Sequence, residues 1–217
     1  MTDFPDFQLK PVAGRNILYV MAALPEYGEH LRTRCQPLFT GIGPVEAGTQ
    51  LSATLARLAG TGSLPDLIVA LGSAGSATLP QTDIFQGASF SYRDMDASPL
   101  GFEKGQTPFL DMPIEIMATM TVPDIPKARL STGANIVSGA AYREIDADMV
   151  DMESFAYLRA ASLFDLPFIT MRGISDGAAD LTHIDDWTQY LHIVDKKLGA
   201  AVDALEAAFA QQNLARR

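Results

Sequence analysis

Apolar residues along this chain occur in short continuous runs that are separated by glycine and proline. Residues 17–23, 67–71 and 168–171 are three such runs of strand length, and they do not alternate with polar positions. Continuous hydrophobicity is typical of central strands that are covered on both faces. Glycine-rich turns follow these runs, and residues 45–58 have a helical pattern between two of them, which predicts βαβ units. We therefore predict an α/β fold with a mainly parallel, mixed central sheet flanked by helices.

The chain of 217 residues is long enough to bury a large core, and we expect a single domain. The apolar spacing of residues 187–210 is helical and predicts a core-packing stripe that begins with Trp187. Residues 136–139 predict a strand followed by a turn. Residues 91–106 have no periodic pattern and predict a polar loop. Residues 1–15 are expected to be a loose N-terminal arm.

Charge and cysteine usage narrow the class of protein. The formal net charge of −10 argues against nucleic acid and anionic membrane surfaces as partners. Cys35 is the only cysteine, so neither an internal disulfide nor a cysteine-based metal cage can form, and we expect a buried, inert thiol. The chain begins without a signal-peptide pattern and has no apolar run long enough to span a bilayer, so a cytoplasmic protein is expected.

Carboxylates gather where the predicted strands end. Glu26 follows the first strand, Asp151 and Glu153 precede a helix-spaced apolar run, and Ser175 and Asp176 follow the third strand. Open α/β sheets bind ligands at this carboxyl edge. The alternative is that Asp151 only caps a helix and that Ser175 and Asp176 only form a turn, because both residue types are common there. The local pattern leaves both interpretations open.

The chemistry available to these residues is acid–base chemistry. No Ser-His-Asp arrangement is present in the sequence, and the three histidines lie outside the motifs. No metal-ligand spacing, dinucleotide fingerprint or phosphate loop occurs, so we expect neither a metal nor a cofactor. Several carboxylates at one sheet edge suit cleavage of a glycosidic bond, in which one acid protonates the leaving group while another group activates water.

Two motifs connect these carboxylates to a known family. VDMES, which contains Asp151, Met152 and Glu153, and RGISDGAAD, which contains Ser175 and Asp176, resemble signatures of the nucleoside phosphorylase/nucleosidase superfamily. Within it, the chain most resembles the 5'-methylthioadenosine/S-adenosylhomocysteine nucleosidases. This resemblance implies a nucleoside phosphorylase-like fold and release of adenine from 5'-substituted adenine nucleosides.

Two glycine turns add to the resemblance. TGIGPVEA, around Ile42, resembles a turn of the nucleosidases, and LGSAGS resembles the loop that passes close to the ribose and the attacking water in that family. The substrate-binding residues implied by LGSAGS are Ser73, Ala74 and Gly75. Taken singly, each of these stretches also fits an ordinary tight turn.

The resemblance assigns roles to the carboxylates. Asp176 would donate a proton to purine N7, although the ordinary aspartate pKa of about 3.9 is too low for this, so burial or a neighbouring charge must raise it. Glu153 would hold the ribose hydroxyls, with Asp151 and Met152 beside it, and Glu26 would activate water. The sequence around Glu26 departs from the family pattern, so its alignment depends on its place after the first strand.

Further roles implied by the resemblance lie outside the carboxylate motifs. Arg172 and Ser175 would support the site from behind. Tyr142 would stack on the purine, and the backbone of Arg143 would read the edge of the base. Phe102, in the predicted loop, would cross into the neighbouring subunit of a homodimer, although its own subunit is the alternative partner.

Two other functions remain as alternatives to hydrolysis. A phosphorylase would use phosphate in place of water, but Glu26 lies where such enzymes bind that anion, and its charge would repel phosphate. A catalytically inactive nucleoside-binding protein is the second alternative. The sequence leaves the 5' substituent open among methylthioadenosine, S-adenosylhomocysteine, 5'-deoxyadenosine and futalosine-type nucleosides.

Overall fold

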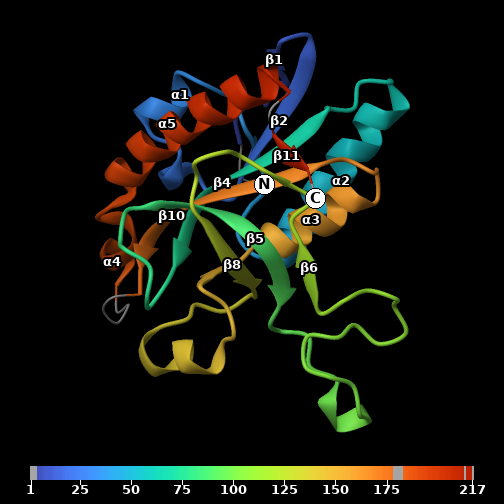
Figure 1. Ribbon diagram of the computed structural model, residues 1–217, viewed down its shortest axis with the longest axis vertical. Coiled ribbons are helices and arrows are strands. Elements are labelled where there is room, and N and C mark those ends of the chain that lie inside the picture. Colours follow the sequence, from blue (N-terminus) through green and yellow to red (C-terminus); the bar gives the residue numbers. More distant parts are fainter. Residues whose placement is uncertain (1–3, 178–182, 213, 217) are drawn as a thin grey trace.

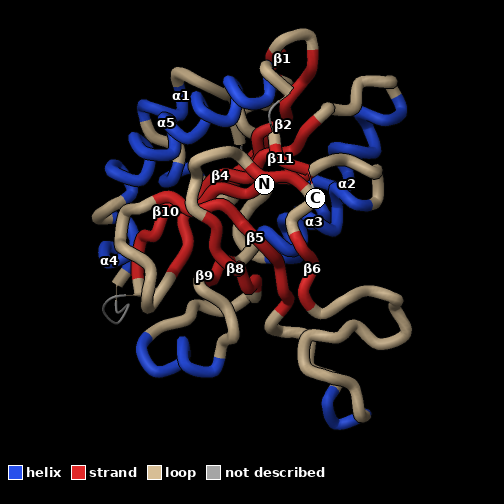
Figure 2. Tube along the Cα trace, in the orientation of Figure 1, coloured by secondary structure: helices blue, strands red, loops and turns tan. Residues whose placement is uncertain are grey.

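The computed structural model describes residues 4–177, 183–212 and 214–216 and has an α/β architecture (Figures 1 and 2). A nine-stranded mixed sheet lies between two helical layers. Helices α1 and α5 cover one face, and α2 and α3 cover the other (Figure 1). The α-helices are α1 (Glu29–Arg32), α2 (Pro44–Gly60), α3 (Ser154–Ser162), α4 (Ile184–Thr188) and α5 (Leu191–Ala210). Short 3-10 turns are η1 (Leu24–Glu26), η2 (Ser98–Leu100) and η3 (Gly139–Glu144).

The sheet follows the order β1-β2-β4-β10-β5-β8-β9, with β3 beside β2 and β6 beside β5. Its strands are β1 (Lys10–Val12), β2 (Arg15–Met21), β3 (Leu38–Phe39), β4 (Leu67–Gly75), β5 (Ile84–Tyr92), β6 (Glu115–Met117), β8 (Lys127–Thr132), β9 (Met149–Asp151) and β10 (Phe168–Asp176). A separate antiparallel pair consists of β7 (Met120–Thr121) and β11 (Ala215–Arg216).

The prediction of an α/β fold with a mixed sheet and flanking helices is confirmed, but the sheet is less parallel than predicted. β2, β4 and β10 are parallel neighbours, whereas β5 runs antiparallel to β10. The link 76–83 between β4 and β5 is shorter than the dozen or so residues of a parallel crossover, so the chain turns back. In addition, β9 pairs with β4 at Gly75 and Val150, which closes the sheet on itself.

Alternation along the central strands explains the two cores. In β2, Tyr19 and its odd-numbered neighbours face α5, and Leu18 and Val20 face α2 and α3. All of these side chains are fully buried. Because successive side chains of a strand point to opposite faces, a strand covered on both sides is apolar at every position. This is the pattern seen in the sequence.

Several local predictions were wrong. Residues 10–15 do not belong to a loose arm, because Lys10–Val12 pairs antiparallel with β2. Residues 136–139 form no strand. The helix predicted from residue 187 is divided, and Trp187 belongs to the separate helix α4. Strands β5 and β8 lay outside the prediction because their apolar residues are interrupted by glycine and polar positions.

The glycine motifs also differ from the prediction. Residues 72–75 and 173–176 are not turns but the last residues of β4 and β10, which remain paired in parallel from Arg172 and Gly72 onward. The carboxyl ends of both strands therefore reach the same place. Within the described part of the chain, no helix has the length and apolar character needed to cross a membrane.

Candidate active site

A cavity of about 490 Å³ opens at the carboxyl ends of β2, β4 and β10, next to the junction of β9 and α3. Nine of the predicted site residues line it together, although they come from five separate segments of the chain. These residues are Glu26, Ile42, Ser73, Ala74, Gly75, Asp151, Met152, Glu153 and Asp176. The sheet therefore assembles in one place what the sequence distributes over 151 positions, from 26 to 176.

Glu26 is the carboxylate that η1 places at the end of β2. It is buried, and its Oε1 accepts hydrogen bonds from the backbone nitrogen of Ser73 at 2.6 Å and from the Ser73 hydroxyl at 2.7 Å. Burial raises the pKa of Glu26, while nearby Arg172 and the two Ser73 donors oppose that rise. The result is a buried carboxylate with a raised pKa and a fixed orientation, which suits a general base.

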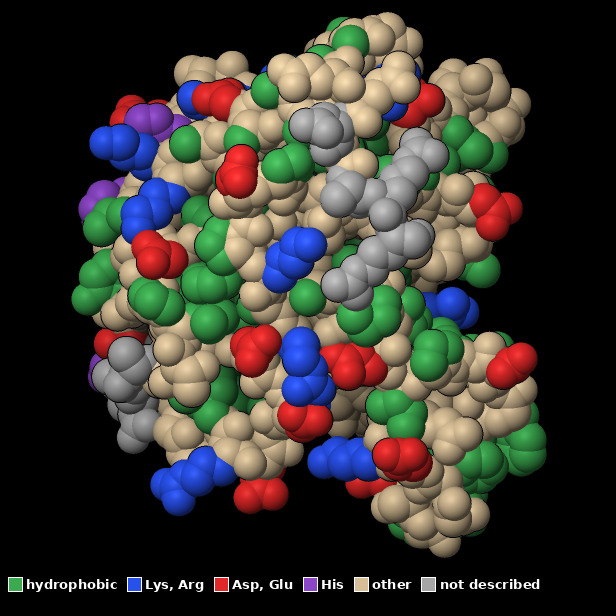
Figure 3. Space-filling view, in the orientation of Figure 1, with side chains coloured by type: hydrophobic (Ala, Val, Ile, Leu, Met, Phe, Trp, Pro, Cys, Tyr) green, Lys and Arg blue, Asp and Glu red, His purple; other side chains and the backbone are tan. Residues whose placement is uncertain are grey.

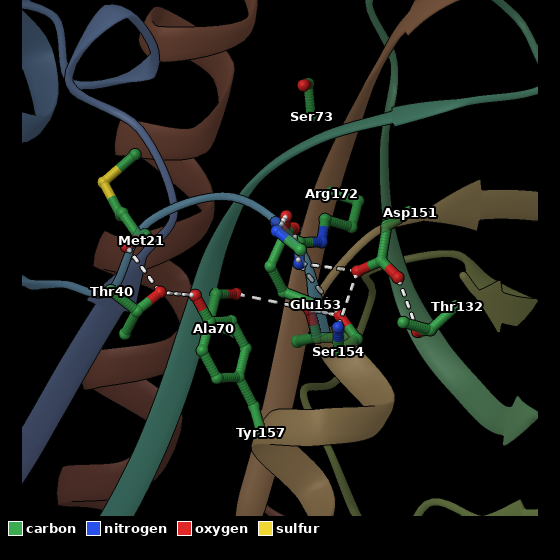
Figure 4. A network of polar contacts seen from close by, with 12 residues as sticks. Met21, Thr40, Ala70, Ser73, Thr132, Asp151, Glu153, Ser154, Tyr157 and Arg172 are labelled. Atoms are coloured by element: carbon green, nitrogen blue, oxygen red, sulfur yellow. Dashed lines mark hydrogen bonds and ion pairs between the residues drawn. The ribbon is translucent and has the colours of Figure 1, made fainter. Parts of the chain in front are cut away.

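Arg172 lies at the centre of the buried charges (Figure 4). Its Nη2 is 2.6 Å from Oδ2 of Asp151, 3.6 Å from Oε2 of Glu153 and 3.0 Å from the hydroxyl of Ser154. Residue 72 must be glycine here, since a Cβ would lie 2.3 Å from Nη1 of Arg172. The guanidinium thus holds the carboxylate of Asp151, on β9, and that of Glu153, at the start of α3.

Asp151 combines both roles that the sequence left open. Its Oδ2 accepts a hydrogen bond from the backbone nitrogen of Ser154 at 3.0 Å, as a helix cap does, and also pairs with Arg172. The hydroxyl of Thr132 donates to Oδ1 at 2.6 Å. Because its oxygens are occupied by the protein, Asp151 orients Arg172 and the start of α3 while it lines the cavity.

Glu153 faces the cavity from the start of α3. Its Oε1 accepts a hydrogen bond of 3.1 Å from the backbone nitrogen of Gly43. The φ of Gly43 is 99°, a conformation that favours glycine. Burial is the main reason that its pKa is raised, Arg172 opposes the rise, and the charges of Asp151 and Glu26 add to it. Two acceptor oxygens at the wall of a cavity can hold a pair of neighbouring hydroxyls.

Asp176 lies at the end of β10, next to Gly75 of β4, where a Cβ would come within 2.8 Å of its Oδ2. The hydroxyl of Ser175 donates to Oδ1 at 2.5 Å, and the hydroxyl of Tyr142 lies 3.5 Å from Oδ2. Burial raises the pKa of Asp176 and outweighs these two donors. A carboxyl that retains its proton more readily than an exposed aspartate is suited to act as an acid.

The remaining predicted residues lie around the cavity. Arg172 donates to Asp151, and Ser175 donates to Asp176. Tyr142 reaches Asp176 through its hydroxyl, whereas Arg143 is exposed on η3. Phe102, in the segment between β5 and β6, is not among the residues that line the cavity, and it packs edge-on against Phe109 with ring centroids 5.5 Å apart. The stacking, base-edge and inter-subunit roles of these residues stay predictions.

Sequence reasoning missed a second part of the cavity wall. This wall contains Arg93, Asn135, Ile136, Val137, His183, Ile184 and Trp187. The sequence pattern places Trp187 in the core and His183 outside the motifs, yet both line the cavity. The signal for a separate helix before α5 was present, because Asp185 and Asp186 are acidic residues of a first turn and His183 caps that turn.

Arg93 organises part of this wall. Its guanidinium donates to the carbonyl oxygens of Ser131 at 2.6 Å, Asp151 at 3.0 Å, Gly133 at 3.1 Å and Asn135 at 2.8 Å. These bonds connect β8, β9 and the segment that carries Ile136. Arg93 therefore shapes the cavity by fixing the backbone of the segments that line it.

The described residues contain no group of three or more histidine, cysteine, aspartate or glutamate side chains placed to hold a metal ion. Cys35 is buried, and burial raises the pKa of its thiol to about 12, in agreement with an inert role. The reactive groups that converge in the cavity are therefore carboxyl groups with their hydroxyl and guanidinium partners.

Comparisons with known proteins show what this chain is similar to. Residues 127–207 match the Phosphorylase superfamily. The 5'-methylthioadenosine/S-adenosylhomocysteine nucleosidase of Haemophilus influenzae (strain PittEE) is 30% identical over 186 residues, which cover 76% of this chain and 77% of that protein. The nucleosidase of the same name from Glaesserella parasuis serovar 5 is 26% identical over 193 residues, 80% of each chain.

Solved structures share the fold. The 5'-methylthioadenosine/S-adenosylhomocysteine nucleosidase of Campylobacter jejuni superposes with a TM-score of 0.71 at 17% identity, covering 89% of this chain and 99% of that one. The Neisseria meningitidis enzyme of the same name, in complex with methylthio-immucillin-A, has a TM-score of 0.69 at 17% identity and covers 88% and 98%. At this identity the likeness shows the fold alone.

Proposed function

The chain belongs to the 5'-methylthioadenosine/S-adenosylhomocysteine nucleosidases of the nucleoside phosphorylase/nucleosidase superfamily, and we propose that its cavity of about 490 Å³ is the active site. The protein is an N-glycosyl hydrolase that releases adenine from adenine nucleosides. That reaction needs an acid that protonates the departing adenine, a general base that activates the attacking water and a group that holds the ribose. The cavity contains a carboxyl group for each of these three roles.

Asp176 is the general acid of the proposed mechanism. Adenine is a poor leaving group as an anion, so a proton must reach its N7 as the glycosidic bond breaks. Burial favours the protonated form of Asp176, and the Ser175 hydroxyl fixes one oxygen of the carboxyl group. Tyr142 lies beside the other oxygen of this carboxyl group, which is consistent with adenine bound next to η3.

Glu26 is the general base, and Glu153 holds the ribose. The oxygen Oε1 of Glu26 is fixed by Ser73, which leaves Oε2 to accept a proton from water. Glu153 uses Oε1 for Gly43 and directs its carboxylate at the cavity next to Met152. Water activated at Glu26 then attacks the anomeric carbon as an oxocarbenium-like sugar develops.

One observation carries this proposal: the carboxyl groups of Glu26 and Asp176 line one cavity, each next to a residue at the carboxyl end of β4. Glu26 contacts β4 at Ser73, and Asp176 lies where a Cβ of Gly75 would be only 2.8 Å away.

Phosphorolysis is not favoured. A phosphate would have to bind among the carboxylates of Glu26, Asp151 and Glu153, two of which Arg172 already pairs with. Hydrolysis needs a neutral water in the same place, so a carboxylate there is an advantage.

The proposal includes a homodimer in which Phe102 enters the partner's cavity. Its support is the projecting segment between β5 and β6, where Leu100 is 79% and Phe109 is 98% exposed. Apolar atoms gather on this projection at the lower right of Figure 3. Large exposed apolar side chains on one segment are typical of an interaction surface. Single-domain organisation and a cytoplasmic location remain predictions from the sequence.

The deciding experiment measures adenine release from methylthioadenosine by wild-type protein and by Asp176→Asn. The amide cannot supply a proton, and loss of general-acid help lowers kcat by about 10² to 10⁴-fold. Adenine affinity and the unfolding temperature should change little. The wild-type product should be free methylthioribose at a rate independent of phosphate. Ribose 1-phosphate as product, or near-normal kcat in Asp176→Asn, would contradict the assignment.

A further inference from the structure

Trp187 makes a contact that core packing does not require. It lies on α4, which packs beside the end of β10, and its side chain lines the cavity. The indole Nε1 donates a hydrogen bond of 2.9 Å to the hydroxyl of Ser73. That same hydroxyl lies 2.7 Å from Oε1 of Glu26. A side chain 114 positions away in sequence is therefore joined through Ser73, at the carboxyl end of β4, to the carboxylate of Glu26.

The direction of these two bonds is fixed by chemistry. An indole nitrogen can only donate, and an ionised carboxylate can only accept. The Ser73 hydroxyl must therefore accept from Trp187 and donate its single proton to Glu26. Without the indole N–H, the hydroxyl would lose this constraint and could turn toward other acceptors.

We propose that Trp187 is a positioning residue that orients the Ser73 hydroxyl toward Glu26 and so couples the seating of α4 over the cavity to the ionised, water-activating state of that carboxylate. This coupling depends on the proposed role of Glu26 as base. It also explains why the aromatic residue at this wall is one with an N–H group.

The setting of Glu26 determines the sign of the effect. The charged or titratable groups around it are Arg172 on β10, Asp151 on β9, Glu153 at the start of α3 and Tyr157 within α3. Arg93, Asp176 and His183 line the same cavity. Donors on Ser73 lower the pKa of Glu26 against the effect of burial. Losing the orientation of one donor therefore raises that pKa and moves the acid limb of the kcat/KM profile to higher pH.

The test is the pair Trp187→Phe and Ser73→Ala, with the double variant. Phenylalanine keeps an aromatic ring and removes the N–H group. We expect Trp187→Phe to lower kcat by about fivefold, the typical worth of one hydrogen bond, and to move the acid limb up by roughly half a pH unit. KM for methylthioadenosine should change by less than about twofold if binding is retained. In the Ser73→Ala background, Trp187→Phe should add little, because the bond it breaks is already absent.

Four results would overturn the inference. A raised KM with unchanged kcat and pH profile would make Trp187 a wall of the pocket only. Full additivity of Trp187→Phe and Ser73→Ala would show that the two side chains act separately. Glu26→Gln distinguishes the base assignment from the coupling: if this variant retains activity, the base assignment fails and the coupling fails with it. If Glu26→Gln is inactive while Trp187→Phe behaves as wild type, only the coupling fails.

Discussion

Replacement of Arg172 by methionine tests the electrostatic design of the site most directly. The guanidinium is 1% exposed and lies between Asp151, Glu153 and Glu26. Methionine has a similar length and fits an apolar environment, but it carries no charge. The variant therefore leaves these carboxylates buried without the cation that pairs with them.

The expected loss of stability follows from the burial. Removing one partner of a buried ion pair costs about 3–5 kcal/mol, because the remaining charge is uncompensated. Here Nη2 contacts Asp151 at 2.6 Å and Glu153 at 3.6 Å and also donates to Ser154 at 3.0 Å. We expect the free energy of unfolding at pH 8 to fall by about 3–5 kcal/mol, a large part of the total of about 5–15 kcal/mol typical for a domain.

The loss should depend on pH in a defined direction. Burial raises the pKa of Glu26 and of Glu153, and Arg172 opposes that rise. Without Arg172 both pKa values in the folded state rise further above their unfolded values. A carboxyl group with a raised folded pKa stabilises the protein at low pH, and that contribution is lost as pH rises through the folded pKa. The deficit of Arg172→Met should therefore be smaller at pH 5.5 than at pH 8.

Urea unfolding followed by circular dichroism at both pH values measures this. The matched control is Arg129→Met, since Arg129 also pairs with two carboxylates, Glu115 at 2.9 Å and Asp146 at 2.8 Å, but is 40% exposed. Exposed ion pairs contribute little, so this control should unfold close to wild type at both pH values. Equal losses for the two variants, or a deficit for Arg172→Met that grows toward pH 5.5, would refute the reasoning.

Two further predictions concern assembly and the α1–α5 contact. Phe102→Ala should raise KM for methylthioadenosine while adenine inhibition changes little, and a fully active monomer in sedimentation at micromolar concentration would contradict the dimer. Asp195 accepts backbone hydrogen bonds from Gly28, His30 and Leu31 at 2.9–3.1 Å, so Asp195→Asn should lower stability by about 1–3 kcal/mol in thermal or urea unfolding. Asp203→Asn, at an exposed position on the same helix, is the control. An equal loss of stability in Asp195→Asn and Asp203→Asn would contradict the role of Asp195 as acceptor for the first turn of α1.

Much of the architecture was determined by the sequence itself. The runs at 17–23 and 67–71 predicted β2 and β4, because a strand covered on both faces must be apolar at every position. The helical spacing after residue 44 predicted α2 for the same kind of local reason. Carboxylates that follow strands were predicted to meet at the sheet edge, and Glu26, Glu153 and Asp176 do line one cavity.

Other features were decided only by tertiary structure. Closure of the sheet depends on the pairing of Val150 with Gly75, which no local pattern specifies. The glycines of β4 look like turn residues in sequence, but Gly72 lies within the strand. A glycine is needed there because the Arg172 side chain of the neighbouring strand occupies the space of a Cβ. Local composition indicates where a backbone can bend, whereas the neighbour determines whether it does.

Trp187 illustrates the same distinction at the active site. Its spacing fits a core stripe, and an indole is apolar enough to be buried there. Its position at the cavity depends on the separation of α4 from α5 and on a hydrogen bond to Ser73, 114 residues earlier. Sequence periodicity reports which side of an element is apolar, but the partner of a polar atom on that element is chosen by the packing of distant segments.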